Sequence, residues 1–242
     1  MFMSQLSWRS RGRERARQLP AVEDRRTSDR LSVLFVTTDR ELLIPVGHDL
    51  GVVYSGADER RQQVRVGVEI AELQDREFAV WLLAHGIDDQ DRPTRSSLTE
   101  RAVTVGLEAG QVAEVAERFL RDGLLAAVDP EADDAVEFAS EHQLFPLLQG
   151  LGPDPDQPWM QTVGLLNQPV AQVSVAVYDV LMWAQLAPEL WSGCHDAAKV
   201  AVQAGVTAPE ETDPRNVLSG VLGQIHGLLC VRAAYFDRRR LR

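Results

Sequence analysis

Residues 98–107 read Leu98-Thr-Glu-Arg-Ala-Val-Thr-Val-Gly-Leu107, and residues 197–206 read Ala197-Ala-Lys-Val-Ala-Val-Gln-Ala-Gly-Val206. The two stretches share an Ala-Val pair and a glycine at matching places: Ala102, Val103, Gly106, Ala201, Val202 and Gly205. Each stretch places apolar residues at helical spacing before a glycine, which favours the end of a helix. A pattern that returns within one chain indicates a repeated structural unit. The sequence therefore predicts that one helical unit occurs twice.

Short strands are expected before the first copy of this unit. Four apolar runs separated by turn-forming residues precede it: Leu31–Thr37, Glu41–Val46, Leu50–Ser55 and Val64–Ile70. The last run alternates apolar and polar residues, which is typical of a strand with one buried face. These runs predict a small antiparallel sheet.

Three helices and one more strand are expected to follow this sheet. Apolar residues at helical spacing lead from Phe78 to Gly86. The stretch Ser97-Leu-Thr-Glu100 matches a capping box at the start of the second helix. A third amphipathic helix ends at Gly123, after which Leu124–Val128 predicts a strand.

The second half of the chain offers the same order of elements. Its strands can come from three apolar runs: Leu144–Leu148, Trp159–Leu165 and Val170–Val175. Residues 173–184 parallel residues 66–84, and His226-Gly-Leu-Leu-Cys-Val231 parallels Asp122-Gly-Leu-Leu-Ala-Ala127. Residues 208–214 have no counterpart in the first half. A shared order of helices and strands can also arise without duplication, so this alternative stays open.

We predict an α+β fold of two tandem units, each a small antiparallel sheet plus three helices. The expected boundaries are a flexible basic segment 1–30, a first unit 31–128, an acidic linker 129–142 that continues after Asp134 as a short helix to His142, a second unit 143–234 and a basic tail 235–242. Two similar units in one chain form a pseudo-dimer, which favours a binding platform over a catalyst.

Charge is distributed unevenly along the chain. Residues 1–30 hold eight arginines and four acidic residues, and residues 231–242 hold five arginines and one aspartate. The formal net charge is −11, so residues 31–230 carry −19. A body this acidic repels a phosphate backbone. The two basic ends are expected to be solvated tails, or to contact nucleic acid or an acidic partner.

The composition is that of a globular, cytoplasmic protein. The 242 residues are 45% hydrophobic, and no apolar run approaches the length of a membrane span. The first twenty residues lack the apolar stretch of a secretory signal. With two cysteines only, a disulfide framework is not expected.

The order helix, loop, short helix, tight turn, helix and Gly-Leu-Leu strand resembles the winged helix-turn-helix superfamily. The stretch Leu98-Thr-Glu-Arg-Ala-Val103 and the later Arg121-Asp-Gly-Leu-Leu125 carry this resemblance. With a sheet placed before the three helices, residues 31–128 also resemble the peptide-clamp domains that bind leader peptides in modified-peptide biosynthesis.

The clamp resemblance implies a peptide site. In that family an extended peptide pairs with a strand edge and lies against the third helix. Carried onto this sequence, the strand is residues 64–70 and the binding residues are Val64, Val66, Val68, Gln111, Val115, Arg118 and Phe119. The expected function is non-catalytic recognition of a peptide or protein partner, as an adaptor in a peptide-modification or regulatory complex.

Two other functions stay open. A winged helix implies a DNA-binding transcriptional regulator, although Glu114, Glu117 and the acidic stretch 129–134 oppose contact with phosphate. An enzyme with an unfamiliar site is the third hypothesis, because no phosphate loop, nucleophile elbow or His-Glu-x-x-His motif occurs.

Cysteine and histidine offer one candidate metal site. His226 and Cys230 are four residues apart, and the adjacent Cys194 and His195 can supply two more ligands of the kind that zinc prefers. The spacing matches no common zinc motif, so neither a metal nor another cofactor is expected. A homo-oligomer is possible, and no membrane partner is expected.

Overall fold

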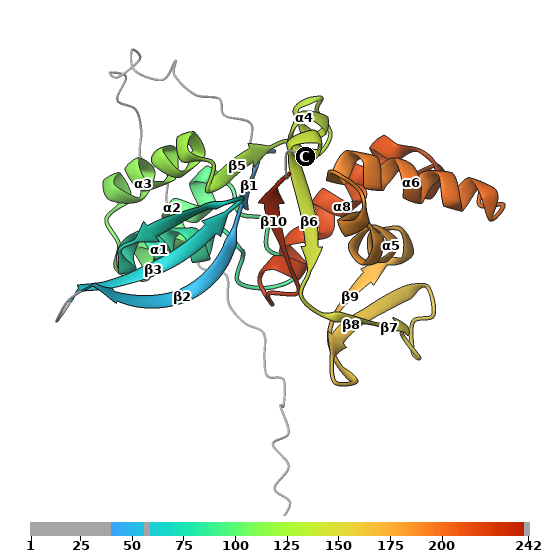
Figure 1. The fold of residues 1–242 in the computed structure, drawn as a ribbon, viewed down its shortest axis with the longest axis horizontal. Helices are drawn as coiled ribbons and strands as arrows, with labels where there is room; N and C mark the ends of the chain where they lie inside the picture. Colours follow the sequence, from blue (N-terminus) through green and yellow to red (C-terminus); the bar gives the residue numbers. More distant parts are fainter. Residues whose placement is uncertain (1–39, 56–58, 240–242) are drawn as a thin grey trace, which may run out of the picture. The chain divides into compact units, whose positions relative to one another are not determined.

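Two sets of helices and strands follow one another in the same order (Figure 1). The computed structural model describes residues 40–55 and 59–239. The first repeat consists of β1 (Leu42–Pro45), β2 (His48–Ser55), β3 (Glu59–Val66), β4 (Glu69–Leu73), α1 (Asp75–Leu83), α2 (Arg95–Thr104), α3 (Ala109–Asp122) and β5 (Leu125–Val128).

The second repeat begins after helix α4 (Asp134–Glu141). It consists of β6 (His142–Pro146), β7 (Gln149–Pro153), β8 (Met160–Leu165), β9 (Gln168–Ser174), α5 (Val175–Trp183), a 3-10 turn (Ala184–Leu186), α6 (Leu190–Gln203), α7 (Pro209–Thr212), α8 (Pro214–Leu229) and β10 (Ala234–Arg238). The predicted α+β fold of two tandem units is confirmed.

Strand pairing is the same in both repeats. The first strand pairs antiparallel with the last, β1 with β5 and β6 with β10. The three strands between form an antiparallel meander, in the order β2-β3-β4 and β7-β8-β9. Each meander therefore has a central strand with two partners and two edge strands with one.

A bulge recurs at the same place in the two meanders. The register shifts between Asp49 and Gly51 in β2, and between Gly150 and Gly152 in β7. Gly51 and Gly152 adopt φ angles of 92° and 89°, which glycine tolerates without steric strain. This shared irregularity supports a structural repeat beyond a shared order of elements.

Matching backbone hydrogen bonds fix the correspondence between the repeats. The amide of Val46 donates to the carbonyl of Leu124 at 2.9 Å, and the amide of Leu147 donates to that of Ala233 at 2.7 Å. Both bonds join the residue after the first strand to the residue before the last. Leu124 and Ala233 thus occupy equivalent positions.

The sequence match that predicted the repeat is confirmed at the second helix. The amide of Leu107 donates to the carbonyl of Ala102, and the amide of Val206 donates to that of Ala201. The same turn therefore ends α2 and α6, as the shared Ala-Val and glycine pattern predicts.

The predicted match of residues 226–231 with residues 122–127 is wrong. Residues Gly227–Leu229 belong to the last turn of α8, and the final strand begins only at Ala234. The left-handed residue that follows the third helix is Gly123 in the first repeat and Arg232 in the second. An arginine in this conformation hides the end of the helix from sequence reasoning, which expects glycine there.

Two predicted boundaries of the second unit also change. Within the predicted linker 129–142, helix α4 buries Ala135, Phe138 and Ala139 in the core. The predicted tail 235–242 includes most of β10, in which Phe236 is fully buried. Both segments carry enough apolar surface to pack, although charged residues surround them. Residues 1–30 and the predicted strand Leu31–Thr37 lie outside the described residues.

Helix α8 owes its start to its first residues and its position to its apolar face. The carboxylate of Asp213 accepts hydrogen bonds from the amides of Arg215 and Asn216, and Pro214 occupies the first helical position. Its buried side chains recur at helical spacing: Val217, Leu218, Val221, Leu222, Ile225, His226, Leu228 and Leu229. This face packs α8 against α5 and α6.

The two repeats join along β1 and β10. Val46 and Phe236 form a parallel bridge, and the amide of Gly47 donates to the carbonyl of Phe236 at 2.7 Å. Nearby, Nε2 of His226 donates to the carbonyl of Leu43 at 3.0 Å. The described residues 40–55 and 59–239 accordingly form one compact unit that contains both repeats.

A buried carboxylate reinforces this junction. Asp237 of β10 is only 3% exposed and accepts from the Arg65 guanidinium at 2.5 Å and from the amide of Gly67 at 2.6 Å. Its own neighbour Arg238 donates a third bond, from its amide, at 2.9 Å. The carboxylate therefore ties the β3–β4 hairpin of the first repeat to the last strand of the second.

We expect Asp237→Ala to lower the free energy of unfolding by about 2–4 kcal/mol, because it leaves the Arg65 guanidinium and the Gly67 amide without their acceptor. Urea unfolding measures the change. The exposed pair between Asp133 and Arg215 provides the control, and Asp133→Ala should leave stability unchanged. Equal effects of the two substitutions would contradict the role assigned to Asp237.

Candidate binding groove

The strand predicted to pair with a peptide does not form as one strand. Residues 64–70 divide into the end of β3, a turn at Gly67 and Val68, and the start of β4. Val64 and Val66 are buried, whereas Val68 is 97% exposed in the turn. Since β3 lies between β2 and β4, its backbone has no free edge. Pairing of a peptide with Val64 and Val66 is therefore wrong, and the edge strand before the helices is β4.

The predicted helix residues do lie on α3, with different surroundings. Gln111 is exposed, Val115 is half-buried and Phe119 is fully buried. The Arg118 guanidinium forms an ion pair with Glu77 of α1 at 2.8 Å, and it also lies over the Phe119 ring. In the first repeat, Arg118 therefore bridges from α3 to α1.

The same helix positions in the second repeat line two cavities. Phe119 of the first repeat corresponds to Leu228 of the second. The amide of Leu124 donates to the Phe119 carbonyl, and the amide of the equivalent Ala233 donates to the Leu228 carbonyl. Counted from this pair, Gln111, Val115 and Arg118 correspond to Gly220, Gln224 and Gly227. All three of these α8 residues line a cavity.

The larger cavity, of about 720 Å³, lies along the edge strand β9. Five consecutive residues, Pro169–Val173, line it together with the loop at residues 87–92 and the end of α8. Because successive side chains of a strand point to opposite faces, a lining of consecutive residues places the cavity beside the strand edge. Within the described residues, β9 pairs with β8 alone, so this edge has no partner strand.

The second cavity, of about 650 Å³, continues past the end of β9, which leads directly into α5 (Figure 1). The start of α5, helix α7 and the middle of α8 line it. Gln224 lines both cavities, and it exchanges hydrogen bonds with the amide and the hydroxyl of Ser174 at 3.1 and 3.2 Å. We call the two cavities together the β9–α8 groove.

Glycines keep this groove open on the side of α8. A Cβ atom at Gly220 would meet nothing within 4 Å, and one at Gly227 would only reach Asp89 at 3.5–3.6 Å. Glycine within a helix is unfavourable by roughly 1 kcal/mol relative to alanine. Sequence reasoning missed this groove, although the glycines at positions 220 and 227 within α8 were its signal.

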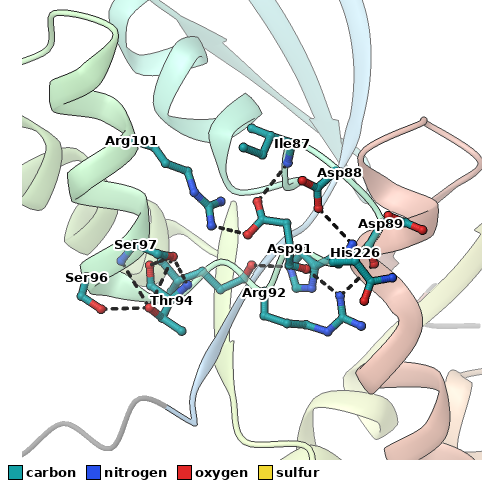
Figure 2. Close-up of polar contacts among 12 residues, drawn as sticks. Ile87, Asp88, Asp89, Asp91, Arg92, Thr94, Ser96, Ser97, Arg101 and His226 are labelled. Carbon is teal, nitrogen blue, oxygen red and sulfur yellow. Dashed lines mark hydrogen bonds and ion pairs between the residues drawn. The ribbon is translucent and has the colours of Figure 1, made fainter. Parts of the chain in front are cut away.

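A loop of the first repeat, held by hydrogen bonds and an ion pair, forms one wall of the groove. Asp91 accepts from the amide of Ile87 at 2.9 Å and forms an ion pair with Arg101 of α2 (Figure 2). Thr94 and Ser97 then cap α2, three residues before the predicted capping box. Figure 2 shows Asp89 beside the helix that carries His226, which agrees with its closeness to Gly227.

The candidate metal ligands are not brought together. Cys194 and His195 lie on α6, and His226 is fully buried against Leu43, while Cys230 lines the groove. No group of three or more such ligands occurs in the part of the chain that the structure describes. Burial raises the pKa of Cys194 to about 12, and burial with the carboxylates of nearby aspartates also raises that of Cys230.

Two ion pairs combine positive and negative side chains on the surface of α3 that would meet DNA. Arg118 pairs with Glu77, and Glu117 of α3 pairs with Arg95 of α2. Negative side chains thus accompany the positive ones along this surface, which weakens attraction to phosphate.

No protein-family model matches the sequence, and no curated protein or solved structure matches the chain. Among the described helices, none has the length and apolar character required to cross a membrane.

The buried His226 makes stability depend on pH. Burial lowers its pKa from 6.5 to about 4, so between these pH values the unfolded chain binds a proton that the folded chain does not. Its contribution to the free energy of unfolding is complete above pH 6.5 and falls, by roughly 3 kcal/mol, as the pH drops to 4.

We expect His226→Leu to reduce this dependence on pH, although the protein also becomes less stable at pH 7 because the Leu43 carbonyl loses its donor. Urea unfolding at several pH values between 4 and 7 measures both effects. An unchanged slope in the variant would show that other groups cause the acid sensitivity. Burial also lowers the pKa values of His85 and His142, so part of the slope should remain.

Proposed function

We propose that this protein binds an extended peptide segment in the β9–α8 groove, as a non-catalytic peptide- or protein-binding module. The observation that carries the proposal is the unpaired edge of β9 beside a cavity of about 720 Å³. An edge strand can pair with an added strand through its backbone groups, and the adjacent cavity leaves room for that strand.

The composition of the groove supports this mode of binding. Pro169 has no amide hydrogen, so pairing would begin at Val170 and continue to Val173. Alternate side chains of the added strand would then point toward α8, where Gly220 and Gly227 leave space. Recognition through the backbone requires no catalytic group, which fits an adaptor.

The arrangement resembles the predicted clamp, transferred to the other repeat. The edge strand that precedes the first helix and the face of the third helix enclose the groove, as that resemblance implies. In the first repeat the positions that correspond to Gly220 and Gly227 carry the larger side chains of Gln111 and Arg118, and the Arg118 guanidinium reaches across to Glu77 of α1. We therefore assign binding to the second repeat.

The test uses full-length protein and a display library of random 12-residue peptides. Peptides selected on the wild-type protein should bind Gly220→Leu at least tenfold more weakly, because the added side chain enters the groove. Fluorescence anisotropy with the selected peptides measures the dissociation constants.

Gly223→Leu is the matched control. It makes the same change in the same helix, also into open space, at a position that lines neither cavity. Both variants should remain folded, since leucine favours a helix more than glycine does. Failure to enrich any peptide, or equal binding to both variants, would overturn the proposal. Tight, salt-sensitive binding of duplex DNA would instead favour the regulator hypothesis.

A further inference from the structure

The β9–α8 groove is strongly acidic. Its lining contains one guanidinium and five carboxylates: Arg92, Asp88, Asp89, Glu131, Glu210 and Glu211. The guanidinium of Arg92 donates to the carbonyls of Asp89 and Asp91, at 3.2 and 2.7 Å, and these bonds stabilise the loop that contains Arg92. The groove therefore carries negative charge at the loop of residues 87–92 and near helix α7.

Several of these carboxylates remain available to a ligand. Asp88 accepts from the amide of Gln90, and Glu131 accepts from the hydroxyl of Ser219, each through one oxygen only. Within residues 40–55 and 59–239, the carboxylates of Asp89, Glu210 and Glu211 have no hydrogen-bond or ion-pair partner. The charge of Glu211 also acts on its surroundings, because burial and this carboxylate raise the pKa of Asp179.

The two groups of carboxylates lie in separate parts of the groove. The loop at residues 87–92 lines the cavity beside β9, and Glu210 and Glu211 line the cavity beyond its end. Gln224 and Ser174 mark the boundary between them. A strand paired with β9 would thus carry its two ends toward two separate groups of carboxylates.

We infer that the segment bound in the groove is basic: an extended peptide with lysine or arginine near both ends and small or apolar residues between. This inference rests on the proposed function, since it names the chemistry of the peptide. Charge complementarity carries it, because cationic side chains would neutralise carboxylates that no residue in the described part of the chain neutralises. An acidic segment would meet repulsion from both groups of carboxylates.

The probes are two fluorescein-labelled ten-residue peptides. In one, two lysines at each end flank six valine and threonine residues, and in the other glutamate replaces every lysine. With the full-length protein, the lysine peptide should bind at least tenfold more tightly at 50 mM salt, and its affinity should fall as salt increases. Fluorescence anisotropy measures both dissociation constants.

Paired charge variants locate the effect. Glu210→Lys with Glu211→Lys should weaken binding of the lysine peptide about tenfold, because it reverses the charge at one end of the groove. Glu100→Lys with Glu114→Lys changes the net charge equally, on α2 and α3 of the first repeat, and should leave the affinity unchanged. Equal losses in the two double variants would overturn the inference in favour of attraction by overall charge.

The outcomes separate this inference from the proposed function. If library peptides bind in a manner sensitive to Gly220→Leu but show no preference for lysine over glutamate, the basic ligand is wrong while the peptide groove stands. The arginine-rich residues 1–30 of this chain are a second candidate for the basic segment that occupies the groove. If replacing their eight arginines with glutamine tightens binding of the lysine peptide, this segment occupies the groove and the assignment to a separate partner is overturned.

Discussion

The structure depends on the pairing of the first strand of each repeat with its last. This pairing closes each repeat, and it brings β10 to the position where Phe236 also bridges to Val46 of the first repeat. The last strand of the chain therefore serves both repeats. Asp237, next to Phe236, adds a buried carboxylate that holds the β3–β4 hairpin. Because backbone and charged groups meet at this junction, the repeats form one compact unit.

The groove follows from this junction. The loop at residues 87–92 belongs to the first repeat, yet it forms a wall of the cavity along β9 of the second. Its shape is set within its own repeat, where Asp91 links Ile87 to Arg101. The second repeat contributes the strand edge and the glycines of α8. Neither repeat alone supplies every wall of the groove, because the second repeat provides the strand edge and α8 and the first repeat provides the loop.

The two repeats have diverged where binding is proposed. Equivalent positions on the third helix carry Val115 and Arg118 in the first repeat, and Gln224 and Gly227 in the second. The Arg118 side chain reaches α1 through Glu77, whereas the Gln224 side chain reaches the end of β9 through Ser174. The core positions beside them remain apolar, as Phe119 and Leu228 show.

The sequence by itself determined the α+β class, the repeat, and the turn that ends α2 and α6, because periodicity and glycine placement act locally. It did not determine where α8 ends, since Gly227 lies within the helix and Arg232 adopts the left-handed conformation. Only the tertiary structure decided that Val64 and Val66 lie on a central strand and that β9 has a free edge. Whether a strand is central or at an edge depends on its partner strands, which can be distant in the chain. Whether a helical glycine faces a neighbouring side chain or a cavity also depends on segments that are distant in the chain.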